Sequence, residues 1–189
     1  MDYYEDAANV EAYIQMAAGY DGRHLMPILR KHLKRSSSLL ELGMGPGVDL
    51  KLLAEEYRVT GSDQSVLFLE RYRRGHPQAD LVVLDARLMD IERSFDCIYS
   101  NKVLQHLTRA ELQESLHRQA DVLVAGGILF HTLWYGEGVE MHAGLRSVYY
   151  TEESFEPLVG SEYELVEVGR YAEMDEGDSL YVVLKKVQP

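Results

Sequence analysis

Short apolar runs alternate with segments of helical periodicity along most of the chain, from about residue 36 onward. Five of the runs predict strands, at residues 38–42, 58–61, 81–84, 95–100 and 128–134. The last run is apolar on both faces, which is typical of a central parallel strand. Helical periodicity fills the intervals at residues 48–56 and 66–74, and from a Thr108–Glu111 capping box to the glycine pair at 126–127. This order predicts an α/β sheet with crossover helices.

The two ends of the chain extend this pattern. Three further helices are predicted, at residues 10–18 and 24–33 and from Thr151 onward. Residues 135–150 predict a polar and aromatic loop. The segments 163–171 and 179–187 predict a closing antiparallel hairpin with a loose turn.

The amino-acid composition limits which binding partners and which cellular location are expected. The 189 residues include 31 acidic and 19 basic side chains, a formal net charge of −12, which disfavours nucleic acid or an anionic membrane as the main partner. The single cysteine, Cys97, excludes an internal disulfide or a cysteine zinc cage, and the seven histidines show no metal-ligand spacing. The acidic N-terminus lacks a secretory signal, and no apolar run approaches the roughly 20 residues that span a bilayer. We therefore expect a cytoplasmic protein without a metal site.

The carboxyl ends of the predicted strands carry the polar chemistry, and ligands of open α/β sheets bind outside these ends. They supply a glycine turn, two carboxylates, an amide and an aromatic pair, at residues 43–47, Asp63, Asp85, Asn101 and 134–135. The glycines separate ligand classes. A dinucleotide fingerprint needs a glycine at its sixth position, which fails in both registers, and no Gly-Lys-Ser/Thr sequence of a P-loop follows. The alternating glycines indicate a loop where backbone approaches a ligand closely.

The two carboxylates each have two interpretations. Asp63 follows Gly43 by twenty residues and is placed to accept hydrogen bonds from a ribose diol. Its alternative role is to cap the next helix, which Ser65 serves equally well. Asp85 either accepts a hydrogen bond from an adenine amine beside Ala86 or caps a turn.

Five segments, at residues 39–47, 59–65, 83–86, 94–107 and 122–130, stand in the order and spacing of one known family. Together they resemble the motifs of class I S-adenosylmethionine-dependent methyltransferases of the small-molecule type. The resemblance implies a Rossmann-like fold, with a seven-stranded, mostly parallel sheet, an antiparallel last strand and helices on both faces. It also implies a single domain over residues 1–189, with three parts. These are an N-terminal helical lid (1–36), a cofactor-binding core (37–134), and an acceptor loop, helix and closing hairpin (135–189).

The same resemblance implies S-adenosyl-L-methionine as cofactor and assigns its contacts by position. The methionine part would be held by Glu41, Gly43, Met44, Gly45, Pro46 and Gly47. Asp63 would take the ribose hydroxyls, and Gln64, followed by Ser65, would lie beside the adenine. The remaining contacts would come from Asp85 and Ala86 at the adenine edge, Asn101 and Lys102 at the methionine side, and Tyr13 and Tyr20 as lid candidates. Met44 stands where a smaller residue or cysteine is commoner, and Ala125 stands where proline is usual.

The acceptor side is less defined by the sequence. An aromatic wall is predicted from Trp134, Tyr135, Tyr149 and Tyr150. With Glu137 and Glu140 nearby, it suits a small neutral or cationic acceptor. His106 is the candidate general base, and its alternative role is to position the helix that begins at Thr108.

The functional prediction is methyl transfer to a small-molecule acceptor by in-line displacement. The alternative is a non-catalytic S-adenosylmethionine sensor or an inactive partner subunit. A nucleotide-dependent oxidoreductase is disfavoured by the failed fingerprint.

Overall fold

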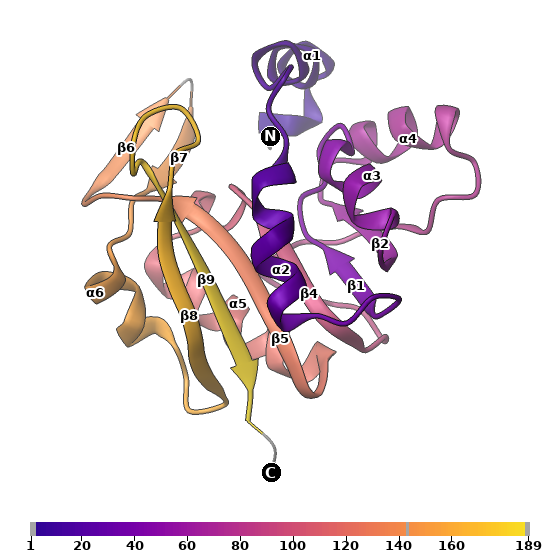
Figure 1. The fold of residues 1–189 in the computed structure, drawn as a ribbon. Helices are drawn as coiled ribbons and strands as arrows, with labels where there is room; N and C mark the ends of the chain where they lie inside the picture. Colours follow the sequence, from indigo (N-terminus) through magenta and orange to yellow (C-terminus); the bar gives the residue numbers. More distant parts are fainter. Residues whose placement is uncertain (1–2, 143, 188–189) are drawn as a thin grey trace.

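A seven-stranded sheet forms the centre of the computed structural model, which describes residues 3–142 and 144–187 (Figure 1). The strands lie in the order β3-β2-β1-β4-β5-β9-β8. Their bounds are β1 Ser38–Glu41, β2 Arg58–Asp63, β3 Leu81–Val83, β4 Phe95–Asn101, β5 Leu123–Trp134, β8 Tyr163–Tyr171 and β9 Ser179–Lys186. Strands β1 to β5 pair in parallel, and β9 is antiparallel to both of its neighbours. The predicted fold class is confirmed.

Helices connect the strands close to where the periodicity predicts them. The α-helices are α1 Ala7–Met16, α2 Met26–His32, α3 Val48–Ala54, α4 Val66–Gly75, α5 Arg109–Val122 and α6 Glu152–Phe155. Short 3-10 helices are η1 Tyr3–Glu5, η2 Gly22–Leu25, η3 Leu104–His106 and η4 Glu156–Leu158. The capping box at the start of α5 is present, with Thr108 and Glu111 bonded reciprocally. No helix within the described ranges is long and apolar enough to cross a membrane.

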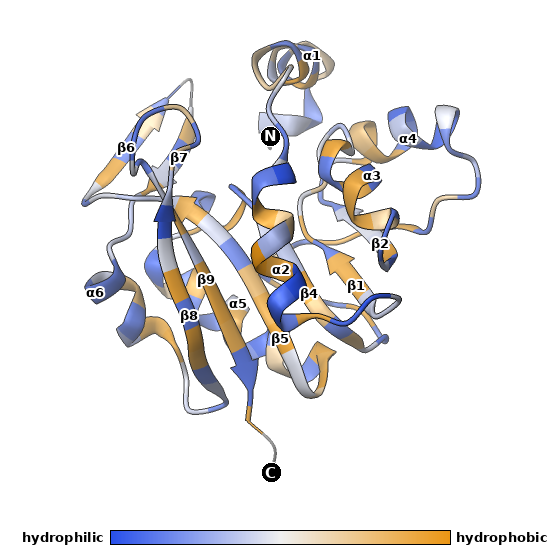
Figure 2. Ribbon diagram, in the orientation of Figure 1, coloured by the Kyte–Doolittle hydropathy of each residue, from blue (hydrophilic) through white to orange (hydrophobic). Residues whose placement is uncertain are grey.

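Both faces of the sheet are buried, which explains why its central strands are apolar on both sides. Leu39 packs with α2 and the end of α3, whereas its neighbour Leu40 packs with α5 on the opposite face. Cys97 and Ile98 in β4 divide in the same way. Figure 2 shows the resulting concentration of apolar residues along β5 and β9. The alternation fixes the strand register, because a shift of one residue exchanges the two faces.

The N-terminal helices occupy two different positions in the fold. Leu25 and Leu29, from η2 and α2, are fully buried against the sheet, so α2 is a layer of the core. In contrast, η1 and α1 contact α4 and supply Tyr4 and Tyr13 to a cavity beyond the strand ends. The position expected for a lid therefore belongs to residues 3–16 only.

Two local features differ from the sequence prediction. The segment 135–150, predicted as a loop, contains the antiparallel hairpin of β6 Val139–His142 and β7 Leu145–Val148. The glycine pair at 126–127 is predicted to end α5, but the helix ends at Val122. The glycines instead lie within β5, where the pairing with β4 shifts register and Gly126 adopts a φ of 73°.

Candidate active site

A cavity of about 270 Å³ opens at the carboxyl ends of β1, β2, β3 and β4. Its volume is close to the lower end of the range for small-molecule pockets, roughly 300 to 1,000 Å³. The described residues that line it are Tyr4, Tyr13, Gly43, Gly45, Asp63, Gln64, Phe68, Leu84, Asp85, Ala86, Arg87, Lys102, Val103, Leu104, His106, Leu107, Glu111, Leu145 and Arg146. Seven of the predicted cofactor contacts and the predicted base are thereby brought to one cavity.

The glycine loop after β1 adopts a backbone that favours glycine. Gly43, Gly45 and Gly47 have φ values of 64°, 49° and 79°. A Cβ at Gly43 would lie 2.6 Å from a methyl carbon of Val103, and one at Gly47 would clash with the Tyr72 ring. Close packing on both sides therefore explains two of the glycines, while Gly43 and Gly45 also form the cavity wall.

Met44 contributes to this loop from its other side. Its side chain is buried and packs with Leu50, Leu69 and Tyr72 in a small core cluster. Its backbone N–H donates to the Ser62 carbonyl at 2.8 Å. A large residue is accommodated at this position because it points into the protein. Met44, Pro46 and Gly47 do not line the cavity.

Asp63 holds the glycine loop and the start of α4 together. One carboxylate oxygen accepts the Gly45 N–H at 2.9 Å, and the other accepts the Ser65 N–H at 2.8 Å. Ser65 makes no side-chain cap, and its hydroxyl donates to the Tyr4 carbonyl. Each carboxylate oxygen has two lone pairs and can therefore accept more than one hydrogen bond. Both predicted roles of Asp63 are therefore compatible with its geometry.

Asp49 is a buried hub behind the loop that the sequence reasoning did not identify. Its carboxylate accepts hydrogen bonds from the Gly22 N–H at 2.6 Å, the Tyr99 hydroxyl at 2.8 Å and the Asn101 amide at 3.0 Å. A Cβ at Gly22 would lie 2.7 Å from this carboxylate, so the N-terminal segment approaches closely. Asn101 is thus engaged behind the cavity and does not line it. The available signal for this hub was a lone acidic residue in a helix whose remaining residues, apart from Lys51, are apolar.

Glu41 lies next to this hub and is buried. Burial, and then the charges of Asp49 and Asp63, raise the pKa of its carboxyl well above the ordinary value. Its Oε2 atom has no hydrogen-bond partner among the described residues. A buried carboxyl oxygen without a partner fits a ligand amino group, although Glu41 is not among the residues that line the cavity.

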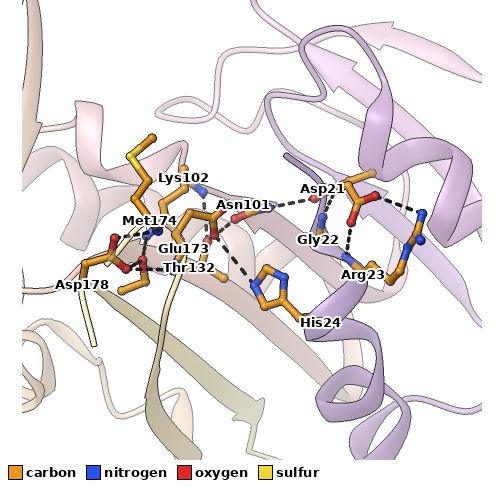
Figure 3. A network of polar contacts seen from close by, with 12 residues as sticks. Asp21, Gly22, Arg23, His24, Asn101, Lys102, Thr132, Glu173, Met174 and Asp178 are labelled. Carbon is orange, nitrogen blue, oxygen red and sulfur yellow. Dashed lines mark hydrogen bonds and ion pairs between the residues drawn. The ribbon is translucent and has the colours of Figure 1, made fainter. Parts of the chain in front are cut away.

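Lys102 follows Asn101 with a φ of 58° and lines the cavity, but its ammonium group points elsewhere. The ammonium donates to the Leu133 carbonyl at 2.9 Å and the Ser179 hydroxyl at 2.6 Å, and it lies 3.7 Å from the centre of the Trp134 ring. Burial lowers the pKa of Lys102 to about 7. Figure 3 shows this lysine in a polar network that also includes Glu173, which pairs with His24 at 3.8 Å.

A chain of buried hydrogen bonds supports the Ala86 side of the cavity. Ser115 donates to the Ala86 carbonyl at 2.6 Å and accepts from the Gln119 amide at 3.0 Å. The Gln119 oxygen lies 2.9 Å from His131 Nε2, and His131 Nδ1 lies 2.8 Å from the Ser100 hydroxyl. Since an amide oxygen only accepts, Nε2 carries the proton, and every donor in the chain points toward Ala86. The four side chains of this chain of hydrogen bonds are all fully buried, namely Ser100, His131, Gln119 and Ser115.

Asp85 contacts its own neighbour in addition to lining the cavity. Arg87 donates to both carboxylate oxygens of Asp85 through its guanidinium, and these bonds lower the pKa of Asp85. The Arg87 backbone N–H also bonds Asp85. Asp85 therefore forms a turn and lines the cavity at the same time.

His106 lies in the cavity wall with a defined orientation. Its Nδ1 is 2.6 Å from the carbonyl oxygen of Arg146 in β7. A carbonyl can only accept, so Nδ1 carries the proton and Nε2 has a free lone pair in the neutral ring. Burial lowers the pKa of His106 below its ordinary value of 6.5. The imidazole is therefore neutral at pH 7, in the tautomer that allows Nε2 to accept a proton.

The four predicted acceptor residues do not line the cavity, because each side chain has another partner. The Trp134 ring covers Lys102, and the Tyr135 ring lies 3.7 Å from the Arg170 guanidinium carbon. Tyr149 donates to Glu140 at 2.9 Å, and Tyr150 is fully buried against Phe155. Tyr20 is 44% exposed and is also absent from the wall.

Several side chains of the cavity wall were not predicted from the sequence. Tyr4 and Phe68 form an aromatic cluster with Tyr13, with ring centres 5.5 to 5.8 Å apart. Leu145 and Arg146 reach the cavity because β7 contacts η3. The available signal for this second pair was the alternation of apolar and polar residues in the hairpin. Within the described ranges, no three His, Cys, Asp or Glu side chains are grouped as a metal site.

Comparison with known proteins identifies related sequences and folds. The Methyltransferase domain family matches residues 39–127. A trans-aconitate 2-methyltransferase of Enterobacter sp. (strain 638) is 34% identical over 100 residues, which are 51% of this chain and 40% of that protein. A dTDP-3-amino-3,6-dideoxy-alpha-D-glucopyranose N,N-dimethyltransferase of Streptomyces fradiae is 30% identical over 146 residues, 72% of this chain and 56% of that protein. The chain thus spans about half the length of these relatives.

A solved structure gives the same picture of the fold. The crystal structure of Burkholderia thailandensis 1,6-didemethyltoxoflavin-N1-methyltransferase, with bound 1,6-didemethyltoxoflavin and S-adenosylhomocysteine, has a TM-score of 0.78 and 21% sequence identity. The match covers 96% of this chain and 85% of that one.

The strand order and the glycine loop, with carboxylates after β2 and β3, define a Rossmann-like methyltransferase fold. With the match over residues 39–127, the chain belongs to the class I S-adenosylmethionine-dependent methyltransferases. The family predicted from the sequence is confirmed.

Proposed function

We propose that this chain transfers the methyl group of S-adenosylmethionine to a small-molecule acceptor that binds beside His106. One observation carries the proposal: the cavity that is lined by Gly43, Gly45, Asp63 and Asp85 is also lined by His106. A candidate cofactor site and a candidate base therefore share one cavity. The two relatives named above act, by their names, on a small organic acid and a sugar amine, which supports a small acceptor.

The geometry of the cavity wall supports the following cofactor-binding roles. Asp63 accepts hydrogen bonds from the ribose hydroxyls, while the Gly43 and Gly45 backbone adjoins the methionine part. Asp85 and Ala86 meet the adenine edge. Tyr4 and Tyr13 close the outer side and exclude water.

Catalysis in this site depends mainly on orientation. When bound, S-adenosylmethionine supplies a methyl group already activated on a sulfonium. Holding an acceptor in line with it removes roughly 7 to 11 kcal/mol of the barrier in well-oriented systems. His106 Nε2 accepts the proton that an acceptor hydroxyl or amine loses, and the Arg146 carbonyl stabilises the resulting imidazolium through Nδ1–H.

The proposal is tested first by cofactor binding and then by product formation. At 100 times its dissociation constant, S-adenosylhomocysteine should raise the melting temperature by roughly 5 to 10 °C, whereas NAD should not. A screen with methyl-labelled S-adenosylmethionine and small acceptors should then yield a labelled product. Binding without transfer to any acceptor would favour the sensor alternative, and a preference for NAD would contradict the cofactor assignment.

A further inference from the structure

Arg146, in strand β7 of the β6–β7 hairpin, contributes to the cavity beside His106 in two ways. Its backbone carbonyl accepts the bond from His106 that sets the imidazole tautomer. Arg146 lines the same cavity, and its guanidinium lies 3.8 Å from Glu111, another residue of the cavity wall. The element that the sequence did not predict therefore lies beside the candidate base.

The Arg146 guanidinium is weakly engaged by the protein. Within residues 3–142 and 144–187, its ion pair is with Glu111 Oε2 at 3.8 Å, which is longer than a hydrogen bond. That oxygen already accepts the Thr108 N–H and hydroxyl, each at 2.8 Å, as part of the α5 capping box. Glu111 is thus held by the helix cap, and the N–H donors of the Arg146 side chain have no hydrogen bond in the described part of the chain.

Neighbouring arginines are held differently. Arg87 makes a two-pronged contact with Asp85. Arg109 donates to two backbone carbonyls, and Arg170 donates to both oxygens of Glu152. Arg146 therefore differs from Arg87 in the cavity wall, and from Arg109 and Arg170 outside it, in offering a guanidinium fork to a ligand.

We propose that Arg146 binds a carboxylate of the methyl acceptor, which would make the acceptor a small organic acid. The inference rests on the proposed function and names its substrate class. The planar fork of a guanidinium matches a carboxylate in a bidentate contact. Because Arg146 also holds His106, the bound carboxylate lies a short distance from the atom that receives the proton. The acceptor thus carries a carboxylate and, a few bonds away, a hydroxyl, amine or second carboxyl group to be methylated.

The experiment uses the full chain saturated with S-adenosylhomocysteine and calorimetric titration of defined probes. The probes are lactate, succinate and trans-aconitate, each beside its neutral amide. At least one carboxylate should bind, and its amide should not. Arg146→Gln should weaken that binding by about tenfold to a hundredfold, and Arg146→Lys by less, because lysine keeps the charge without the fork.

Two controls separate this role from folding and from cofactor binding. Arg146→Gln leaves the backbone carbonyl in place, so the affinity for S-adenosylhomocysteine should stay within about twofold. Arg118→Gln, on the outer side of α5 and paired with Glu114, should change neither affinity. In turnover with a carboxylate acceptor, Arg146→Gln should raise KM far more than it lowers kcat.

The outcomes distinguish this inference from the proposed function. If no carboxylate binds, if amides bind equally well, or if Arg146→Gln has no effect, the inference is overturned while the methyltransferase assignment stands. If S-adenosylhomocysteine itself does not bind, the proposed function fails. The probes are then titrated into the free protein, where dependence on Arg146 decides the inference alone.

Discussion

The Ser115 hydroxyl donates a 2.6 Å hydrogen bond to the backbone carbonyl of Ala86 and so joins the interior of the protein to the cavity wall. This bond ends the buried chain that begins at Ser100 and passes through His131 and Gln119. Hydrogen bonds that point the same way polarise one another in a low-dielectric interior. The position of the loop at Ala86 therefore depends on side chains that never touch the ligand.

Replacement of Ser115 tests this dependence. Ser115→Ala leaves the Ala86 carbonyl and the Gln119 amide without their partner, and it should lower the free energy of unfolding by about 1 to 3 kcal/mol. Because the loop is freed, the affinity for S-adenosylhomocysteine should also fall by about threefold or more. Ser38→Ala is the matched control, since Ser38 bonds Asp96 at the start of β1, away from the cavity. Calorimetry that finds equal cofactor affinity in the two variants would contradict the positioning role.

His131 gives the fold a predictable response to acid. Burial lowers its pKa from 6.5 to about 3, so the unfolded chain takes up a proton below pH 6.5 that the folded chain does not. The free energy of unfolding should fall through this group by about 2 kcal/mol at pH 5. In urea titrations, the His131→Gln variant should have a lower free energy of unfolding than the original protein at pH 7. That free energy should fall by less between pH 7 and pH 5 than it does in the original protein. His142→Gln, on the exposed hairpin, is the control; an unchanged slope for His131→Gln would refute the assignment.

Asp63 should matter for cofactor affinity. A ribose diol donates charge-assisted hydrogen bonds to its carboxylate, each of which contributes about 1.5 to 3 kcal/mol. Asp63→Asn should therefore weaken S-adenosylhomocysteine binding by about tenfold to a hundredfold. Asp80→Asn is a control, since Asp80 pairs with Arg93 outside the cavity. An unchanged affinity in calorimetry would leave Asp63 with the single role of holding Gly45 and Ser65.

Tyr13 and Tyr20 form a matched pair for the lid. Tyr13 lines the cavity and packs against Phe68 with ring centres 5.8 Å apart, whereas Tyr20 is outside the wall. Burial and the nearby Asp63 charge raise the pKa of Tyr13 to about 12, so its hydroxyl stays protonated. Tyr13→Leu should weaken S-adenosylhomocysteine binding several-fold, and Tyr20→Leu should leave it unchanged. Equal effects would show that the place of Tyr13 in the cavity wall does not cause the loss of affinity.

Protonation of His106 should lower kcat/KM at acid pH. Since burial lowers its pKa, kcat/KM should stay level at pH 7 and decline only below about pH 6.5. His106→Gln should remove this decline and reduce turnover by about a hundredfold or more, with the cofactor affinity intact. A reduction below about tenfold would leave orientation as the whole mechanism and His106 as a positioning residue for α5.

The parts of the site that the sequence predicted are those fixed by backbone geometry. Gly43, Asp63 and Asp85 follow strands that the apolar runs predict, so their place at one sheet edge followed from topology. Trp134 also follows a predicted strand, yet its ring turns to Lys102. Which face a side chain takes at a strand end depends on local packing. Arg146 could not be placed without the hairpin, whose first strand is exposed and whose second strand is partly buried, so that the alternation in its sequence is a weak signal.

The base of the hairpin has a consequence for how such an enzyme diversifies. Tyr135 and Tyr150 are joined by a parallel bridge, and Tyr150 N–H donates to the Trp134 carbonyl at 3.0 Å, so the chain returns to its point of departure. Residues 136–149 thus form an excursion whose length and sequence are uncoupled from the register of β5 and β9. New variants of this excursion can be exchanged without disturbing the cofactor half. During evolution, replacement of residues 136–149 can therefore change the acceptor that is bound, while the residues proposed to bind the methyl donor stay the same.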